Sequence, residues 1–280
     1  MNKGPLKSLN DHYSQPDLTK RILKALLDAG LDPAQLKCDD LELLDEFHIR
    51  GKQATRELAN LCQLQKNHEV LDLGCGIGGP ARFMAEEFGC RVLGLDLVQP
   101  YCDAATELTK LTGLGDRVSF QQGDMCEMPF ADAAFDRVWS QHTLMNIADK
   151  AALATEIRRV LRPGGKAVFY EVCTGDGEPV HLPVAWASEP AHSHLCSPEE
   201  LRSILADSGL TEAVWEDVTG VCLDWLNGMV ANLQNRRVDS RPRPSLGLLM
   251  GKDAGAKSRN LGRNLREGRI VVVRGVFTVC

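Results

Sequence analysis

The 280-residue sequence lacks long apolar runs, and no segment approaches the ~20 apolar residues that a membrane-spanning helix needs. Its opening stretch, MNKGPLKSLNDHYSQ, lacks the apolar core of a secretory signal. The ten cysteines form no CxxC pair and no spaced Cys/His cluster, so neither a disulfide frame nor a zinc site is indicated. We therefore expect a cytoplasmic protein with reduced thiols, no bound metal and no membrane partner.

The sequence also lacks an excess of positive charge, since its net charge is −6. This value argues against a general nucleic-acid-binding protein. Residues 236–269 are the exception, with ten Lys or Arg and three Asp or Glu, a local balance of +7 against −13 for the rest of the chain. This segment is either a solvated basic helix pair or a lid whose arginines meet an anionic substrate group.

Glycine is concentrated in one stretch, VLDLGCGIGG, which occupies residues 70–79. The apolar residues before the glycines predict a short buried strand, and the glycines predict the turn that follows it. A helix is expected from Pro80 to Gly89, with proline at an early position and glycine at its end. Strand, glycine turn and helix together predict a nucleotide-binding unit, because glycines let the backbone approach a ligand and a helix N-terminus offers unpaired N–H groups.

Two carboxylates help to decide which nucleotide binds. The spacing Gly74-x-Gly76-x-x-Gly79 satisfies the dinucleotide fingerprint, so NAD remains an alternative. Asp72, just before the first glycine, would repel a pyrophosphate and attract the cationic aminoacyl end of S-adenosylmethionine (SAM). Asp96 ends the second expected strand, where a carboxylate can bind ribose hydroxyls in either case. The first carboxylate therefore favours SAM.

The remaining chain alternates strand and helix patterns, which predicts a mostly parallel sheet covered on both faces. We expect an α/β fold, a doubly wound seven-stranded sheet with helical additions at the N-terminus and between the last two strands. Residues 1–65 are interpreted as an N-terminal helical cover, with helices at 18–31 and 53–63. Residues 66–280 form the expected core, including a helical lid insertion at about 220–268.

The sequence resembles the class I SAM-dependent methyltransferases, whose fold is Rossmann-like. The motifs that carry the resemblance are VLDLGCGIGG, the strand-end Asp96, QQGDM, FDRVWSQ and VLRPGGK. Four further stretches, LDEFHIRGKQAT, WSQHTLMNI, LPVAWASEP and NLREGRIVVVRGVF, resemble the bacterial sarcosine/dimethylglycine-type small-molecule methyltransferases. One departure is Gln141-His142, where that group has Gln-Asp, and it argues against an amino-acid amine as substrate.

The resemblance implies a set of cofactor-binding positions. The glycine turn should line SAM, Asp96 should bind the ribose, Leu97 should pack on adenine, and Asp124 should accept from the adenine amino group. Cys75 is interpreted as a small residue of the turn whose thiol a bound cofactor would cover. The full set is Asp72, Gly74, Cys75, Gly76, Gly78, Asp96, Leu97, Gly123, Asp124, Met125 and Gln141.

Catalytic and substrate-binding candidates lie around the same strand ends. His142 follows the fourth expected strand and is the strongest candidate for taking a proton from the acceptor or orienting it. Tyr13 and His48 are further catalytic candidates, and Arg50 and Trp186 join these three as substrate-binding candidates. His181, His192 and His194 lie close together in sequence, but nothing else in the chain indicates a metal.

The expected function is transfer of the SAM methyl group to a nitrogen or sulfur of a small-molecule acceptor, an amine or a thiol, by in-line displacement, leaving S-adenosylhomocysteine. The alternatives are an NAD-dependent oxidoreductase and a non-catalytic SAM-binding regulator. Methylation of RNA or protein is a further alternative that only the basic segment favours. The protein is expected to be a monomer or a homodimer.

Overall fold

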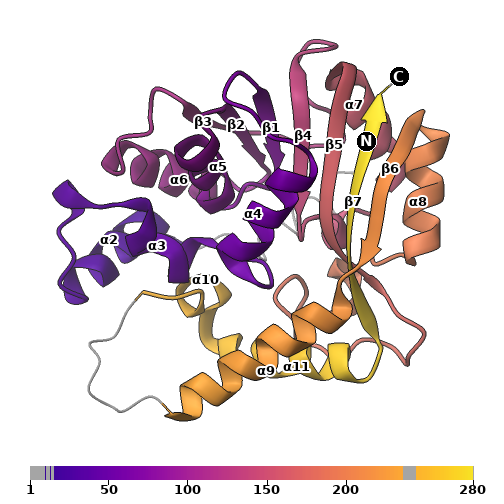
Figure 1. The fold of residues 1–280 in the computed structure, drawn as a ribbon. Coiled ribbons are helices and arrows are strands. Elements are labelled where there is room, and N and C mark those ends of the chain that lie inside the picture. The colour runs from indigo at the N-terminus through magenta and orange to yellow at the C-terminus, as the bar shows by residue number, and fades with distance from the viewer. Residues whose placement is uncertain (1–9, 11–12, 14–15, 236–243, 280) are drawn as a thin grey trace.

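The computed structural model describes residues 10, 13, 16–235 and 244–279. Their centre is a seven-stranded sheet in the order β3-β2-β1-β4-β5-β7-β6. Neighbouring strands from β3 to β5 run parallel, and β7 is antiparallel to β5 and β6 (Figure 1). The strands are β1 (Glu69–Leu73), β2 (Arg91–Asp96), β3 (Val118–Gln122), β4 (Phe135–Gln141), β5 (Leu161–Thr174), β6 (Leu210–Asp217) and β7 (Ile270–Val279). The predicted doubly wound, mostly parallel sheet is confirmed.

Helices cover both faces of this sheet, because its central strands are buried on both sides. Val70 packs in the cluster that contains Met84, whereas its neighbour Leu71 packs in the cluster that contains Ile157. Successive side chains of a strand point to opposite faces, so an unbroken apolar run is what a doubly covered strand needs. The described helices are α2 (Leu18–Asp28), α3 (Cys38–Asp45), α4 (Gly51–Leu61), α5 (Gly79–Phe88), α6 (Gln99–Leu111), α7 (Lys150–Val160), α8 (Pro198–Asp207), α9 (Thr219–Asn235), α10 (Gly247–Met250) and α11 (Ala254–Arg266).

Two local features differ from the predictions. Helix α3 was not predicted, because it is short; it buries Leu41 and Leu44, and the Asp40 carboxylate accepts a hydrogen bond from the N–H of Lys37 at 2.9 Å. The pattern KAALATEIRRVLRPGG predicts a helix closed by Pro163 and Gly164, whereas strand β5 already begins at Leu161. A proline disfavours helical backbone in the residue before it, which explains why the chain is already extended there.

The N-terminal helices and the late insertion meet at one place. The N–H of Leu246 donates to the carbonyl of Leu43 at 2.9 Å and thus joins α10 to α3. Figure 1 shows α9, α10 and α11 below one end of the sheet, near α3. Of the described helices, none has the length and apolar character to cross a membrane. The division into a cover of residues 1–65 and a core of 66–280 stays a prediction.

Candidate active site

A cavity of about 880 Å³ lies at the carboxyl ends of the parallel strands, between the sheet, the N-terminal helices and the late insertion. Ligands of doubly wound folds bind at this edge. The strand ends contribute Gly74–Gly76 after β1, Asp96 of β2, Gly123 and Asp124 after β3, and Gln141–Thr143 at the end of β4. The order of strands therefore brings together most of the residues predicted to bind the cofactor.

The glycines of the turn have different roles. Gly76 has φ +54°, and an added Cβ would meet nothing within 4 Å, so its backbone leaves room on the cavity wall for a ligand. Gly74 has φ +67°, and its Cβ would lie 2.5 Å from Thr143. Gly78 is not among the described lining residues, and its Cβ would lie 2.5 Å from Phe120. Its role is to form the turn, which argues against the predicted contact with the cofactor.

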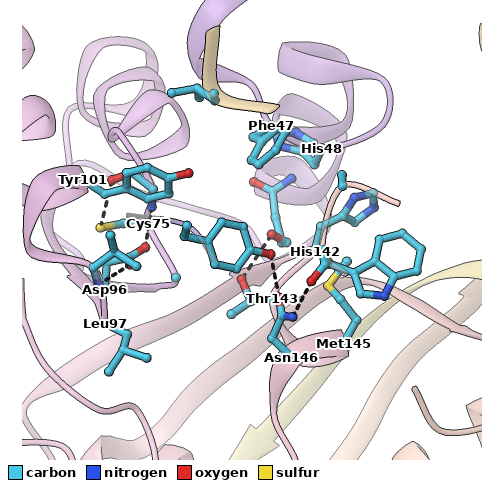
Figure 2. Close-up of a pocket in the computed structure, with 18 of the residues that line it drawn as sticks. Phe47, His48, Cys75, Asp96, Leu97, Tyr101, His142, Thr143, Met145 and Asn146 are labelled. Carbon is cyan, nitrogen blue, oxygen red and sulfur yellow. Dashed lines mark hydrogen bonds between the residues drawn. The ribbon is translucent and has the colours of Figure 1, made fainter. Parts of the chain in front are cut away.

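Asp96 presents its carboxylate to the cavity. Oδ2 accepts from the N–H of Gly76 and Oδ1 from the N–H of Val98, both at 2.9 Å (Figure 2). Burial raises the pKa of Asp96 to about 6. Each carboxylate oxygen has a second lone pair, so the group can still accept hydrogen bonds from two ligand hydroxyls.

Asp72 lies behind the glycine turn and is not among the described lining residues. Its carboxyl is buried, and Oδ2 has no hydrogen-bond partner among the described residues. Burial, and secondarily the charge of Asp96, raise the pKa of Asp72 to about 8. Its predicted attraction for the cationic end of SAM stays a prediction, since the carboxyl would act through the turn rather than by direct contact.

The residues predicted to bind adenine also lie on the cavity wall. Leu97, Gly123, Asp124 and Met125 all line the cavity, and Asp124 Oδ1 accepts from the N–H of Cys126 at 2.8 Å. This bond forms an Asx turn and leaves Oδ2 for a ligand. Cys75 also lines the cavity, but burial raises the pKa of its thiol well above the ordinary value, so the thiol is unreactive at neutral pH.

Tyr101 is a wall residue that the sequence reasoning missed. It lies in the first turn of α6, the helix that follows the strand of Asp96, and its hydroxyl is buried without a hydrogen-bond partner among the described residues (Figure 2). Its ring packs edge-on against Tyr13, with centroids 6.1 Å apart. An aromatic residue in the first turn after a ribose-binding carboxylate is the signal that could have identified it.

His142 occupies a turn at the end of β4 with φ +52°. Its N–H donates to the carbonyl of Tyr170 at 2.8 Å, and its ring stacks on the Tyr170 ring with centroids 5.1 Å apart and planes 9° apart. The carboxylate of Glu171 holds this turn by accepting from the N–H groups of Thr143 and Leu144 at 2.9 and 3.0 Å. Glu171 was not predicted, because it acts from the neighbouring strand.

The protonation state of His142 differs from the expectation. Burial, and secondarily His48, lower the pKa of His142 well below its usual value, and Nε2 is buried without a partner among the described residues. The imidazole is therefore neutral at physiological pH and too weakly basic to take a proton from an ammonium group. It can orient an acceptor as a neutral group beside the cavity.

Gln141 and His48 share a buried hydrogen-bond network. Gln141 Oε1 accepts from Trp139 Nε1 at 2.7 Å and from Thr55 Oγ1 at 3.3 Å, whereas its Nε2 has no partner among the described residues and remains a donor. His48 Nε2 lies 3.1 Å from both Thr55 Oγ1 and the carbonyl of Gly51. Burial lowers the pKa of His48 to about 4. Both side chains line the cavity (Figure 2 labels His48), but His48 is neutral and held at the start of α4.

Arg50 pairs with a residue of α4 and does not line the cavity. Its guanidinium makes two hydrogen bonds to Glu57, at 2.9 and 2.6 Å, and the residue is not among those described as lining the cavity. This ion pair argues against the predicted contact between Arg50 and the substrate. The arginine instead stabilises the packing of α4.

Tyr13 and Trp186 are brought together by Asn146, which sequence reasoning missed. Tyr13 donates its hydroxyl hydrogen to Asn146 Oδ1 at 2.8 Å. Asn146 Nδ2 donates to the carbonyls of Trp186 and His192 at 2.8 and 2.9 Å (Figure 2 labels Asn146). One amide side chain thus joins three parts of the chain around the cavity.

The basic segment of residues 236–269 is only partly described. Residues 236–243, with four of its arginines, lie outside the described residues. Arg263 and Arg269 pair with Glu267, so this described part is largely a solvated helix face. Lys257 lines the cavity. Among the described side chains, no group of three or more His, Cys, Asp or Glu is placed to hold a metal ion.

Comparison with known proteins identifies the central part of the chain. Residues 71–169 match a family model described as a methyltransferase domain. This segment is therefore similar to methyltransferase domains. The chain is 33% identical over 166 residues to the methyltransferase GfsG of Streptomyces halstedii, a match that covers 59% of this chain and 58% of that protein. It is 30% identical over 187 residues to a phosphoethanolamine N-methyltransferase of Triticum aestivum, covering 67% of this chain and 36% of that protein.

The matches therefore span 58% and 36% of these two relatives' own length, less than two thirds in both cases. A geranyl diphosphate C-methyltransferase from Streptomyces coelicolor A3(2), solved with Mg²⁺, geranyl diphosphate and S-adenosylhomocysteine, is similar to the whole chain. The TM-score is 0.70 at 17% identity, covering 100% of this chain and 99% of that structure, which shows a shared fold. The match to methyltransferases, which use SAM, supports SAM as the cofactor rather than NAD. The open wall at Gly76, the acceptor oxygens of Asp96 and the unpartnered donor of Gln141 fit this molecule.

Proposed function

We propose that the protein transfers the methyl group of SAM to a nitrogen or sulfur atom of a small-molecule acceptor. The observation that carries the proposal is that one cavity joins the nucleotide-binding strand ends to the turn at His142 and to the loop and helices around Trp186. A cofactor and an acceptor can therefore lie in contact. The wheat relative, which is named an N-methyltransferase, supports nitrogen over sulfur.

SAM supplies a methyl group that is already activated on a sulfonium. The lone pair of the acceptor atom forms the new bond to the methyl carbon as the carbon–sulfur bond breaks, with its electron pair staying on sulfur. Aligning these atoms can contribute about 7–11 kcal/mol to lowering the barrier. The protein's part is to fix both molecules and to exclude water.

His142 and Trp186 are the side chains best placed to fix the acceptor. His142 stays neutral, so an amine must enter without its extra proton and a thiol must lose its proton to solvent. The Gln141-His142 pair and the neutral imidazole both argue against a zwitterionic amino acid, so membership of the sarcosine/dimethylglycine-type group stays a prediction.

The test is transfer of tritium from methyl-labelled SAM to a panel of amines, amino acids and thiols. We expect label in at least one acceptor, and we expect the Asp96→Asn protein to lose it together with SAM affinity. Tight SAM binding without transfer to any acceptor would favour the regulator alternative instead.

A further inference from the structure

The cavity has a second part, away from the nucleotide-binding strand ends, which we name the acceptor chamber. It is bounded by the loop after β5, by α9 and by residues 246–261. All the large side chains that these segments contribute, apart from two histidines and a lysine, are apolar. The main ones are Trp186, Trp225, Leu226, Met229, Leu249 and Leu261.

Apart from Asp96 and Asp124 at the cofactor end, each charged group of the described cavity wall has a hydrogen-bond or ion-pair partner within the protein. The carboxylate of Asp45 pairs with Arg82 at 2.7 Å, and both side chains are buried. The Asp149 carboxylate caps α7 by accepting a backbone hydrogen bond at 2.9 Å. The ammonium of Lys257 donates to the carbonyl of Met250 at 3.0 Å. No arginine is among the described lining residues.

This wall discriminates between classes of acceptor. An ammonium group transferred into the acceptor chamber would lose hydration without gaining an opposite charge, which is strongly unfavourable. A carboxylate or phosphate group would meet a single cation among the described residues of the chamber, Lys257, on a wall that is otherwise apolar. A hydrocarbon would gain from burial in proportion to its apolar surface. The volume of about 880 Å³ is at the upper end of the 300–1,000 Å³ that is typical of small-molecule sites, so the cavity has room for an acceptor of substantial size beside the cofactor.

We propose that the acceptor is a predominantly apolar molecule, an alkyl or aryl amine or thiol, whose hydrocarbon body fills the acceptor chamber while its neutral nitrogen or sulfur faces the turn at His142. The proposal rests on the methyltransferase function proposed above. It predicts that small zwitterions and phosphorylated amines are poorer acceptors than alkyl or aryl amines and thiols.

The first experiment uses homologous series of n-alkylamines and n-alkanethiols, from ethyl to octyl, with tritium transfer from SAM as the readout. We expect kcat/KM to rise about two- to fourfold per added methylene in at least one series, since burial of one methylene corresponds to about that factor. Sarcosine and phosphoethanolamine serve as polar comparison substrates of similar reactivity. A flat dependence on chain length, or a preference for either polar amine, would overturn the proposal.

A matched pair of variants on α9 locates the effect. Leu226 lines the chamber, whereas Val221 is 49% exposed and is not among the described lining residues. Leu226→Asn should reduce kcat/KM for octyl acceptors about tenfold or more and leave ethyl acceptors nearly unchanged. Val221→Asn should leave the whole series unchanged. Equal loss for short and long acceptors in Leu226→Asn would contradict binding of the hydrocarbon in the chamber.

Calorimetry with protein saturated with S-adenosylhomocysteine separates the two proposals. If octylamine or octanethiol binds with an affinity that rises with chain length but is never methylated, the apolar chamber stands and the proposed function fails. If only polar amines are methylated, the function stands and the apolar acceptor is wrong.

Discussion

His142 shows how a single residue is fixed for a role that its sequence position suggests. Its φ of +52° is a left-handed conformation that costs of the order of 1–3 kcal/mol for a residue other than glycine. The hydrogen bond to the carbonyl of Tyr170 and the stacking on the Tyr170 ring hold it there. The strain places a neutral imidazole at the cavity wall, where it can orient an acceptor without carrying charge.

The pH dependence of activity follows from this neutral state. Because the folded pKa of His142 lies well below 6.5, the ring does not change charge between pH 6 and 8. We expect His142→Gln to lower kcat/KM about five- to tenfold through one lost hydrogen bond, while leaving the shape of the pH profile unchanged. An inflection near pH 6.5 that is present in the wild type and absent from the variant would contradict this.

The pH dependence of the unfolding free energy gives an independent check that His142 is neutral in the folded protein. The unfolded chain binds a proton at His142 below about pH 6.5 and the folded chain does not, so the histidine lowers stability as the pH falls below that value. In urea unfolding between pH 5 and 7, His142→Gln should therefore lose less stability on acidification than the wild type does.

Gly76 and Gly113 form a natural matched pair. Both have positive φ, +54° and +73°, and an added Cβ at either would meet nothing within 4 Å, but only Gly76 lines the cavity. Replacing either glycine by alanine should lower the unfolding free energy by about 1–2 kcal/mol, because at both positions the alanine would have to adopt left-handed backbone. Only Gly76→Ala should weaken SAM binding, by about tenfold or more in calorimetry. Equal SAM affinities of the two variants would mean that Gly76 does not face the cofactor.

Single site residues could be predicted from the sequence where their role depends on neighbouring residues in one motif. Asp96 and Gly76 were predicted because a strand, a glycine turn and a carboxylate have fixed spacing. Tyr101, Asn146 and Glu171 were not, because each acts on a segment that is distant in sequence. Arg50 was assigned to the substrate from its position alone, and its pairing with Glu57 could not be read from the sequence.

At the scale of elements, the turn after β4 depends on its neighbour β5. Glu171 of β5 accepts from two backbone N–H groups of the turn and from Ser140 Oγ at 2.6 Å. Burial raises the pKa of Glu171 to about 7. A buried carboxylate that holds three donors fixes the turn, and with it the position of His142.

Glu171→Gln tests this coupling, because an amide offers only one accepting oxygen. We expect a loss of about 1–3 kcal/mol in unfolding free energy and a lower kcat with little change in SAM affinity. The control is Glu212→Gln on β6, which removes an exposed ion pair with Arg202 of α8 and should cost under about 1 kcal/mol. A fall in SAM affinity as large as the fall in kcat would contradict a role confined to the turn.

The direction in which stability changes with pH gives a second test of the role of Glu171. The folded pKa of Glu171 is about 7, above the unfolded value of about 4.3, so the folded state binds more protons in that interval. The contribution of this group to stability is present below pH 4 and is lost as the pH rises toward 7. Urea unfolding of Glu171→Gln should show a smaller loss of stability over this interval than the wild type.

Elements with strong local signals were predicted well. The pattern SPEELRSILADSGL predicts a helix with Ser197 as its N-cap, and α8 has this cap; α5 ends at Gly89 as predicted. All seven strands lie where apolar runs and turn residues indicate. Helix α3 was missed because eight residues carry too little periodicity. The meeting of α10 with α3 is a tertiary contact between segments some 200 positions apart, and no local pattern encodes it.

At the scale of the whole molecule, Asn146 connects the parts that enclose the cavity. It accepts from Tyr13 of the N-terminal region and donates to the backbone at Trp186 and His192 in the loop after β5. Enclosing the cavity excludes water from it, and electrostatic interactions at the reacting atoms are stronger when water is absent. Opening and closing around this amide should therefore set how fast SAM leaves.

A double-mutant cycle on Tyr13 and Asn146 tests this connection. Tyr13→Phe should lower the unfolding free energy by about 1 kcal/mol, and Asn146→Ala by about 1–3 kcal/mol, because the latter also leaves two backbone carbonyls without their donor. The double variant should lose about 0.5–1 kcal/mol less than the sum, since the two side chains share one hydrogen bond. Both single variants should also release SAM several-fold faster in stopped-flow measurements.

The control is Lys24→Gln, which removes an exposed ion pair with Asp28 on α2 and leaves the cavity untouched. It should change neither SAM release nor stability by more than about 0.5 kcal/mol. Exact additivity of the Tyr13 and Asn146 variants, or release rates equal to that of Lys24→Gln, would show that the N-terminal helices cover the cavity without being coupled to it. Coupling would instead mean that the N-terminal region, the turn after β4 and the loop after β5 close over the cofactor as one unit.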